Sequence, residues 1–171
     1  DFVKGQRNLH DYPPDIRTGI HLHRAIDRFT DSHPTVLASR ALISPARRRF
    51  AGILVDVFYD HYLARHWGRF SAEPLGNFTA RVYATLWPRR GDFPERLQRI
   101  LPWMRADDWL ASYAGIESVD AALHGIARRF ARYPRAAVLA GGVHELLAND
   151  AALERHFLDF FPQLEQFAGS G

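Results

Sequence analysis

A histidine and an aspartate four residues apart are the first side chains in this sequence that suggest metal binding. His23 and Asp27 belong to the segment 14–29, whose helical repeat places both on one face with Ile16 and Ile20. Imidazole and carboxylate groups at this spacing converge like two ligands of one metal ion. We expect both side chains to point inward, either as ligands or as a buried hydrogen-bonded pair that orders the core.

A second group of polar side chains interrupts the otherwise apolar segment 53–67. Asp56 and Asp60 are again four residues apart on one face, and His61 lies beside them. Burying these groups is costly unless a cation or strong donors compensate. Two carboxylates about 6 Å apart also repel each other, which raises the pKa of one unless a positive charge lies near both. The alternative to a metal ion is an ion pair between either aspartate and one of the arginines.

Together the two segments offer nitrogen and oxygen ligands without sulfur, a set that suits Mn²⁺, Fe²⁺ or Mg²⁺ at least as well as Zn²⁺. The sequence contains no cysteine, which excludes disulfides, thiolate zinc sites and a cysteine nucleophile, and favours a reducing compartment. The formal net charge is +3, and every basic residue except Lys4 is an arginine. This charge favours an acidic partner.

The elements that must position these side chains are all expected to be helices. Prolines and the Asn149-Asp150 pair mark the breaks, and no stretch has the two-residue alternation of a strand. The expected helices span 15–31, 35–43, 46–67, 74–87, 93–104, 107–114, 118–132, 135–148 and 150–168. We predict an all-α, single-domain helical bundle over 1–168, with 46–67 its most buried helix and 169–171 a linker remnant.

No apolar run approaches the roughly 18–20 residues of a membrane span, and no secretory signal opens the chain. We expect a soluble, cytoplasmic protein. Three arginine clusters are most simply solvent-exposed, or else they form a patch for an acidic protein or for phosphates; they are Arg47-Arg48-Arg49, Arg89-Arg90, and Arg128-Arg129 with Arg132 and Arg135. Large aromatic side chains are expected in the core, including Trp67, Trp87, Trp103 and Trp109.

These residues, taken together, resemble the acyl carrier protein phosphodiesterase family, a divergent branch of the HD-domain metal hydrolases. The matching strings are Asp1-Phe2-Val3-Lys4-Gly5, Pro13-Pro14-Asp15, Gly19-Ile20-His21-Leu22-His23-Arg24, Ile26-Asp27, Thr30-Asp31, Asp56, Asp60-His61, Arg65-His66-Trp67, Phe157 and Phe160-Phe161-Pro162. The family's amino-terminal helix, which precedes the Asp1 string, is expected to be missing here. The helical dipeptide Asp60-His61 also reverses the His-Asp order of ordinary HD enzymes.

The resemblance implies an HD-domain-like fold and Mn²⁺-dependent hydrolysis, with Mg²⁺ or Fe²⁺ as alternatives. The bond cleaved would join 4′-phosphopantetheine to a serine of acyl carrier protein, converting the holo form to the apo form in fatty acid biosynthesis and lipid metabolism. The expected metal ligands are His23, Asp27 and Asp60, completed by Asp1, which either binds the metal or positions the water. Asp56 and His61 would hold ligands in place or pass a proton.

Arg24 and Arg28, with His21, would bind the substrate phosphate or the carrier protein. The arginine-rich exterior would receive the acidic carrier protein, and we expect neither a nucleic acid nor a membrane as partner. One rival hypothesis is an HD-like phosphohydrolase acting on a nucleotide or another small phosphodiester. The other is a non-catalytic helical adaptor whose acids are structural. Metal analysis separates the adaptor from both enzymes, and product analysis separates the enzymes from each other.

Overall fold

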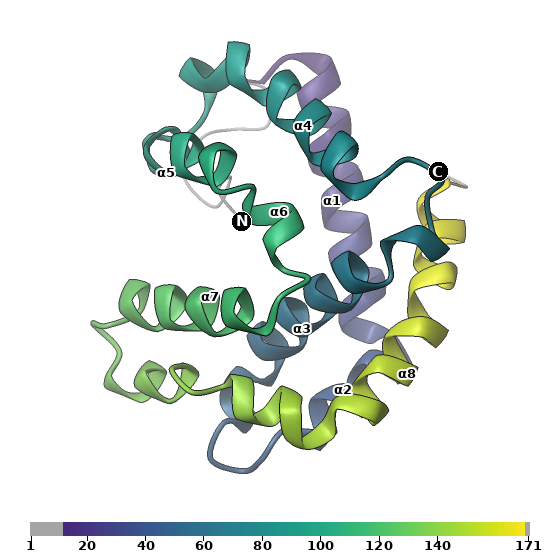
Figure 1. Ribbon diagram of the computed structural model, residues 1–171, viewed down its shortest axis with the longest axis vertical. Coiled ribbons are helices and arrows are strands. Elements are labelled where there is room, and N and C mark those ends of the chain that lie inside the picture. Colours follow the sequence, from purple (N-terminus) through teal and green to yellow (C-terminus); the bar gives the residue numbers. More distant parts are fainter. Residues whose placement is uncertain (1–11, 170–171) are drawn as a thin grey trace. The chain divides into compact units, whose positions relative to one another are not determined.

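The computed structural model describes residues 12–169, and within this range the chain is helical and contains no strand (Figure 1). The predicted all-α class is confirmed. The helices are α1 (Pro14–Ser32), α2 (Pro34–Leu42), α3 (Ala51–Arg65), α4 (Leu75–Leu86), α5 (Glu95–Ala106), α6 (Trp109–Ser112), α7 (Ile116–Arg129) and α8 (Val143–Gly169), with short 3₁₀ turns η2 (Arg48–Phe50), η3 (Trp67–Arg69), η4 (Trp87–Asp92) and η5 (Pro134–Leu139). None of the described helices combines the length and apolar character needed to span a bilayer.

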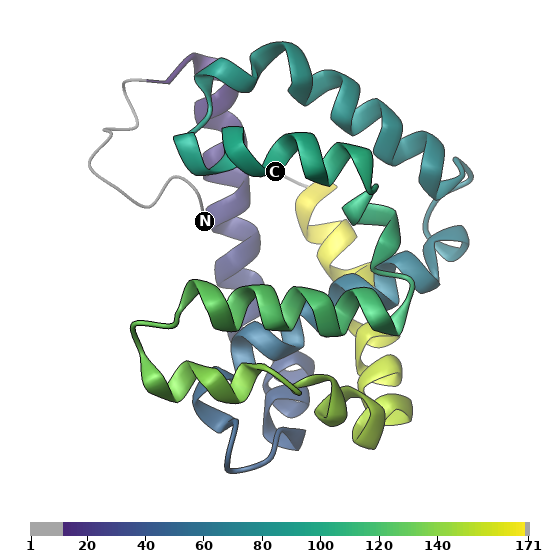
Figure 2. The same cartoon turned by 60° about the vertical axis from the view of Figure 1, so that its left-hand side comes forward.

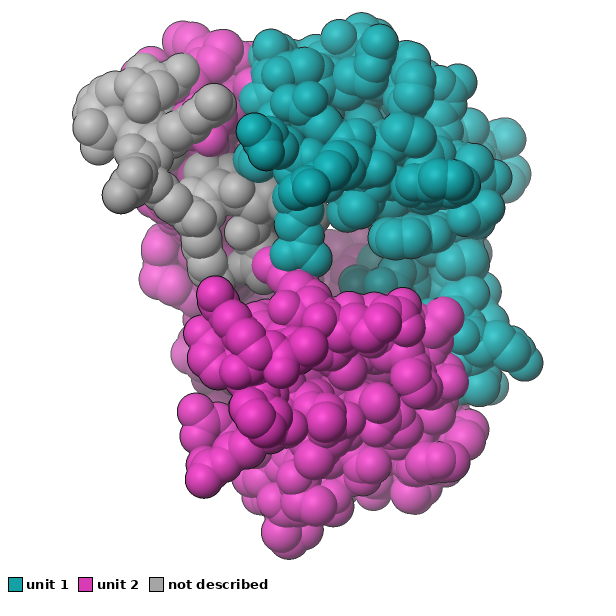
Figure 3. Space-filling view, turned by 90° about the vertical axis from the view of Figure 1, so that its left-hand side faces the viewer, with its two compact units in different colours: residues 1–6, 60–119 teal, residues 7–59, 120–171 magenta. Residues whose placement is uncertain are grey.

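The chain divides into two compact units, coloured separately in Figure 3. Of the described residues, unit 1 comprises 60–119 and unit 2 comprises 12–59 and 120–169. Helix α3 therefore contributes its first part to unit 2 and its last part to unit 1. The prediction of a single domain over 1–168 stays a prediction.

In unit 2, α2 packs along α8, and α1 packs against both (Figures 1 and 2). Pro34 starts α2 because a proline lacks the N–H that would have no partner in the first turn, and the His33 imidazole accepts a hydrogen bond from the Thr35 N–H. Phe29 of α1 stacks on Phe167 of α8, with ring centroids 4.5 Å apart. These contacts build a largely apolar, aromatic interior for unit 2.

Unit 1 is held together by contacts among α4, α5, α6 and η4. Tyr83 and Leu101 are buried, and the Tyr83 hydroxyl accepts a hydrogen bond from the Leu110 N–H. Asp108 starts α6 from the left-handed region, at φ 43°, and its carboxylate accepts hydrogen bonds from the Ala111 N–H and the Thr79 hydroxyl. A short polar side chain tolerates this backbone region better than a bulky one.

Helix α3 is the most buried helix, as predicted. Its buried side chains cover a broad arc of the helix, and the exposed Asp56 and Asp60 lie together on the remaining side. The buried residues are Ala51, Leu54, Val55, Val57, Phe58, Tyr59, His61 and Tyr62. The predicted start at residue 46 is wrong, because α3 begins at Ala51 and is preceded by a turn and by η2.

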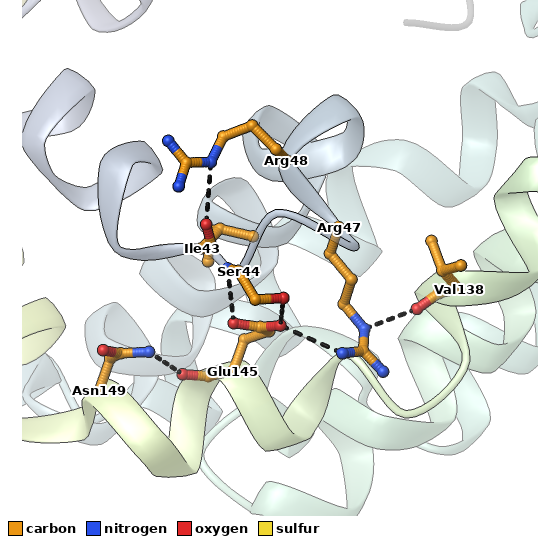
Figure 4. A network of polar contacts seen from close by, with 7 residues as sticks. All are labelled: Ile43, Ser44, Arg47, Arg48, Val138, Glu145 and Asn149. Carbon is orange, nitrogen blue, oxygen red and sulfur yellow. Dashed lines mark hydrogen bonds and ion pairs between the residues drawn. The ribbon is translucent and has the colours of Figure 1, made fainter.

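The turn ahead of α3 is fixed by Glu145, a buried residue in the first turn of α8 (Figure 4). The Glu145 carboxylate accepts hydrogen bonds from the Ser44 N–H and hydroxyl and from the Arg47 guanidinium at 3.1 Å. Arg47 also donates its Nε–H to the Val138 carbonyl at 2.8 Å. Arg47 is therefore half-buried and stabilises this turn, and its prediction as a solvent-exposed arginine is wrong.

The predicted helix 135–148 is also wrong, because the chain breaks between η5 and α8. Gly141 adopts φ +74°, a left-handed conformation that glycine allows without strain. At Gly142 a Cβ atom would lie 2.6 Å from Leu54 Cδ2 and 2.9 Å from the Leu139 carbonyl oxygen, so no side chain fits. The predicted break at Asn149 is confirmed as a local departure from helical geometry inside α8, at φ −122°.

The prediction that all four tryptophans are core residues is wrong for two of them. Trp103 is 66% exposed, and Trp109 is also exposed. Trp67 and Trp87 are half-buried. The guanidinium carbons of Arg90 and Arg105 both lie over the Trp87 ring, 4.8 and 4.9 Å from its centroid. Cation–π contacts of this kind allow a tryptophan to lie near the surface without being fully covered.

Candidate active site

Helix α1 carries His23, Asp27 and Asp31 at four-residue spacing, which places them along one stripe of the helix. The predicted pairing is confirmed, since His23 Nδ1 lies 3.6 Å from Asp27 Oδ1. The predicted inward orientation is wrong, because the two side chains are 56% and 55% exposed. The reason is that α1 buries none of its residues fully, so its packed face is only partly covered and the polar stripe reaches solvent.

Asp56 of α3 also reaches solvent, in contrast to the predicted burial. Its pKa is nevertheless raised from 3.8 to about 6, mainly because the surrounding protein desolvates the carboxylate. The Arg40 guanidinium lowers the pKa, whereas the carboxylates of Asp31 and Asp27 raise it. The sequence predicted a raised pKa from repulsion by Asp60, but the acids that raise it belong to α1. Asp56 thus shares one electrostatic environment with the α1 stripe.

Arg40 of α2 supplies positive charge beside Asp31 and Asp56, and the sequence did not point to it. Its Nη2 donates to Asp31 Oδ1 at 2.6 Å, and its guanidinium lies 3.7 Å from the position a Cβ would take at Gly52 of α3. Its Nε–H is buried and has no acceptor among residues 12–169. The one signal in the sequence that could have pointed to Arg40 is Gly52 of α3, because its missing side chain leaves room for the Arg40 guanidinium beside that helix.

His61, in unit 1, is buried as expected of a residue that holds others in place. Its Nδ1 lies 2.8 Å from the Tyr113 carbonyl oxygen, which can only accept, so the proton is on Nδ1. Nε2 is left as an acceptor, and it is buried without a partner in the described part of the chain. Burial, together with the nearby Asp60 carboxylate, raises the pKa of Tyr113 to about 12.

The predicted metal ligands are distributed over both units and beyond the described residues. His23 and Asp27 belong to unit 2, whereas Asp60 belongs to unit 1 and is exposed instead of buried. Asp1 lies outside the described residues. Between residues 12 and 169, no three His, Asp or Glu side chains come close enough together to hold a metal ion. The ligand set therefore stays a prediction.

The predicted substrate-binding residues His21, Arg24 and Arg28 are all exposed on α1. They are accessible to an anionic ligand from solvent. His21 and His23 are both exposed. The two histidines still differ in direction, because residues two apart on a helix diverge by about 200°, and only His23 is paired with Asp27.

Comparisons with known proteins identify relatives over nearly the full length of the chain. The family model described as acyl carrier protein phosphodiesterase matches residues 1–164. A protein named acyl carrier protein phosphodiesterase from Escherichia coli O6:H1 is 34% identical over 169 residues, covering 98% of this chain and 86% of the relative. A protein of the same name from Salmonella dublin is 36% identical over 165 residues, covering 96% and 83%. No solved structure matches the chain.

Proposed function

The chain belongs to the acyl carrier protein phosphodiesterase family, and from this premise we propose that it hydrolyses the phosphodiester between 4′-phosphopantetheine and the serine of acyl carrier protein. Water supplies a hydroxyl group to phosphorus, and the bond from phosphorus to the serine oxygen breaks. The products are free 4′-phosphopantetheine and the apo carrier protein with its serine hydroxyl restored. The observation that carries the proposal is the family match over residues 1–164.

We also propose a divalent metal ion as cofactor, Mn²⁺ first, with Mg²⁺ or Fe²⁺ as alternatives. The donors of unit 2 fit such an ion chemically, because the imidazole of His23 and the carboxylates of Asp27, Asp31 and Asp56 are nitrogen and oxygen ligands without sulfur. The electrostatics are compatible with it, since the pKa of Asp56 is raised first by desolvation and then by the acids of α1, and a cation would relieve that repulsion. When bound, the ion would polarise a phosphate oxygen and acidify a water molecule.

The residues of the chain itself have the following proposed roles. His23 and Asp27 would hold the ion, and Asp56 would accept a proton from the attacking water. A carboxylate with a pKa of about 6 is still ionised at neutral pH and is a stronger base than an ordinary aspartate. Arg24 and Arg28 would neutralise the phosphate, since their side chains are exposed on the same helix.

Arg40 would position the acids without touching the substrate, because it is already paired with Asp31. The roles predicted for Asp1 and Asp60 as ligands, and for His61 in passing a proton, remain proposals. For His61 the supporting observation is its fixed tautomer, which leaves Nε2 free of a proton. A role in fatty acid biosynthesis and a cytoplasmic location are proposed from the same resemblance and from the absence of cysteine.

The test is product analysis on holo acyl carrier protein. The purified chain, freed of metal and then given Mn²⁺, is expected to release 4′-phosphopantetheine and to reduce the mass of the carrier protein accordingly. The Asp56→Asn variant serves as the control that lacks the proposed base. Turnover of a nucleotide or another small phosphodiester, without any release from holo carrier protein, would instead establish the rival phosphohydrolase. Turnover of neither substrate, together with no metal uptake, would favour the adaptor.

A further inference from the structure

Unit 2 contains a long stretch of chain that has basic residues and no acidic ones. Between Asp120 and Glu145 the sequence has no aspartate or glutamate, and four arginines fall within eight residues. They are Arg128, Arg129, Arg132 and Arg135, and we call them the arginine segment. All four are exposed, and none forms an ion pair with another residue of the range 12–169. The segment is therefore a concentrated positive charge that faces solvent.

The arginine segment lies where the chain reverses direction after α7. Figures 1 and 2 show α7 and the following turn η5 running side by side, joined by a short loop. Arg128 and Arg129 end α7, Arg132 lies in the loop, and Arg135 is in η5. The Arg129 and Arg132 guanidinium groups lie 5.4 and 4.9 Å from the ring centroids of Phe130 and Tyr133. Stacking on a ring restrains a guanidinium while leaving its N–H edges available to carboxylates. Tyr133 itself is exposed and adds an aromatic contact surface.

The structure distinguishes this segment from the other two arginine clusters. In the 47–49 cluster, Arg47 is neutralised by Glu145, and Arg48 donates its Nε–H to the Ile43 carbonyl at 2.9 Å. In the 89–90 cluster, Arg89 lies 3.8 Å from Asp92, and Arg90 is stacked on Trp87 and bonded to its carbonyl. Arg47 also has a structural role, since it ties the loop ahead of α3 to Val138 in η5. It thereby fixes the backbone that follows the arginine segment.

We propose that the arginine segment is the docking surface for the acidic carrier protein. The proposal rests on the proposed function, because that function supplies an acidic protein as the substrate. Exposed guanidinium groups bind carboxylates in a bidentate manner and accelerate the encounter with an oppositely charged partner. Binding that occurs away from the reacting phosphodiester is expected to affect KM and to leave kcat nearly unchanged. A nucleic acid would be attracted by the same charge, and the experiment treats it as a separate outcome.

The experiment compares two double charge reversals on the full chain. The test variant is Arg132→Glu with Arg135→Glu, and the matched control is Arg99→Glu with Arg155→Glu, which changes the net charge equally at exposed positions. With holo carrier protein at low salt, we expect the test variant to raise KM about tenfold or more and to change kcat by less than about twofold. The control is expected to change neither constant by more than about twofold. Raising the salt concentration should increase KM for the unaltered chain and much less for the test variant.

Binding of apo carrier protein, measured by calorimetry, tests docking without any chemistry. Loss of this binding in the test variant alone, with unchanged circular dichroism and melting temperature, supports the proposal. Equal effects of the test and control variants overturn it, because they would reflect net charge only. An unchanged KM with normal turnover overturns the docking surface and leaves the proposed function intact.

Failure of the unaltered chain to release 4′-phosphopantetheine instead contradicts the function, and the calorimetry then decides the docking surface independently. Loss of binding to a DNA duplex without any effect on carrier protein would assign the segment to nucleic acid.

Discussion

Replacing Asp56 with asparagine is expected to stabilise the metal-free protein while abolishing its proposed activity. The pKa of Asp56 is raised to about 6, first because the surrounding protein desolvates it and then because Asp31 and Asp27 repel its charge; Arg40 only partly compensates. An acid whose pKa is higher in the folded state than in the unfolded chain destabilises the fold when it is ionised. Asparagine keeps the shape of the side chain and removes this charge.

The size of the effect follows from the two pKa values. Each pKa unit corresponds to about 1.4 kcal/mol, so the difference between 3.8 and about 6 sets an upper limit of about 3 kcal/mol for Asp56→Asn at neutral pH. Because Asp56 is exposed, solvent screens much of this penalty, and we expect a gain of about 1 kcal/mol. The gain is fully present above about pH 6 and is lost as the pH falls through 3.8, because only below that pH is the wild-type carboxyl group protonated in both states.

The assay is denaturant unfolding of both proteins in chelator, at about pH 7.5 and about pH 3, followed by the same measurement with Mn²⁺ at the higher pH. In chelator at the higher pH the variant should be the more stable protein, and at the lower pH the two should coincide. With Mn²⁺ the order should reverse, since an ion that binds only the folded state adds stability by mass action. A variant that is less stable than the wild type in chelator, or a difference that does not depend on pH, would refute the electrostatic argument.

Three further predictions follow from the same structure. His23→Ala should lose metal and single-turnover activity, whereas His21→Ala should keep its metal; metal analysis beside rapid-quench kinetics checks this. Glu145→Gln should lower the free energy of unfolding by about 2 kcal/mol at pH 7. Burial favours a raised pKa of Glu145, but its hydrogen bonds from Ser44 and Arg47 outweigh it and lower the pKa, so the difference between the two proteins should shrink as the pH falls below 4.5. Gly142→Ala should destabilise by about 1–3 kcal/mol, whereas Gly76→Ala, where a Cβ meets no atom within 4 Å, should be close to neutral in thermal melting.

The sequence predicted the helical class and the central helix because those features depend on local composition. A largely apolar segment without glycine or proline, such as 53–65, forms a buried helix in most surroundings. Prolines marked the starts of α1 and α2 for an equally local reason, since a proline occupies the first turn of a helix without losing a hydrogen bond.

The predictions that failed depend on contacts between residues distant in the sequence. Helix α3 starts five residues later than expected because Ser44 and Arg47 bind Glu145, about a hundred positions away. The break at Gly141 and Gly142 looked like a continuing helix, because nothing local shows that Leu54 fills the space beside Gly142. Periodicity likewise gives the face on which His23 and Asp27 lie, but it does not give how much of that face is covered.

Arg40 provides too little positive charge to join all the acids beside it in unit 2 into a closed ion-pair network. One guanidinium is paired directly with Asp31, while Asp27 and Asp56 have no arginine within ion-pair distance among residues 12–169. One positive charge does not balance three carboxylates, and the pKa of Asp56, which desolvation raises first, is raised further by the charges of Asp31 and Asp27. A purely structural group would be expected to be neutral overall, because unbalanced charge costs stability. A divalent ion at this group would supply the missing positive charge, so Mn²⁺ is expected to stabilise the wild type more than Asp56→Asn, whereas an adaptor with structural acids would show no such difference.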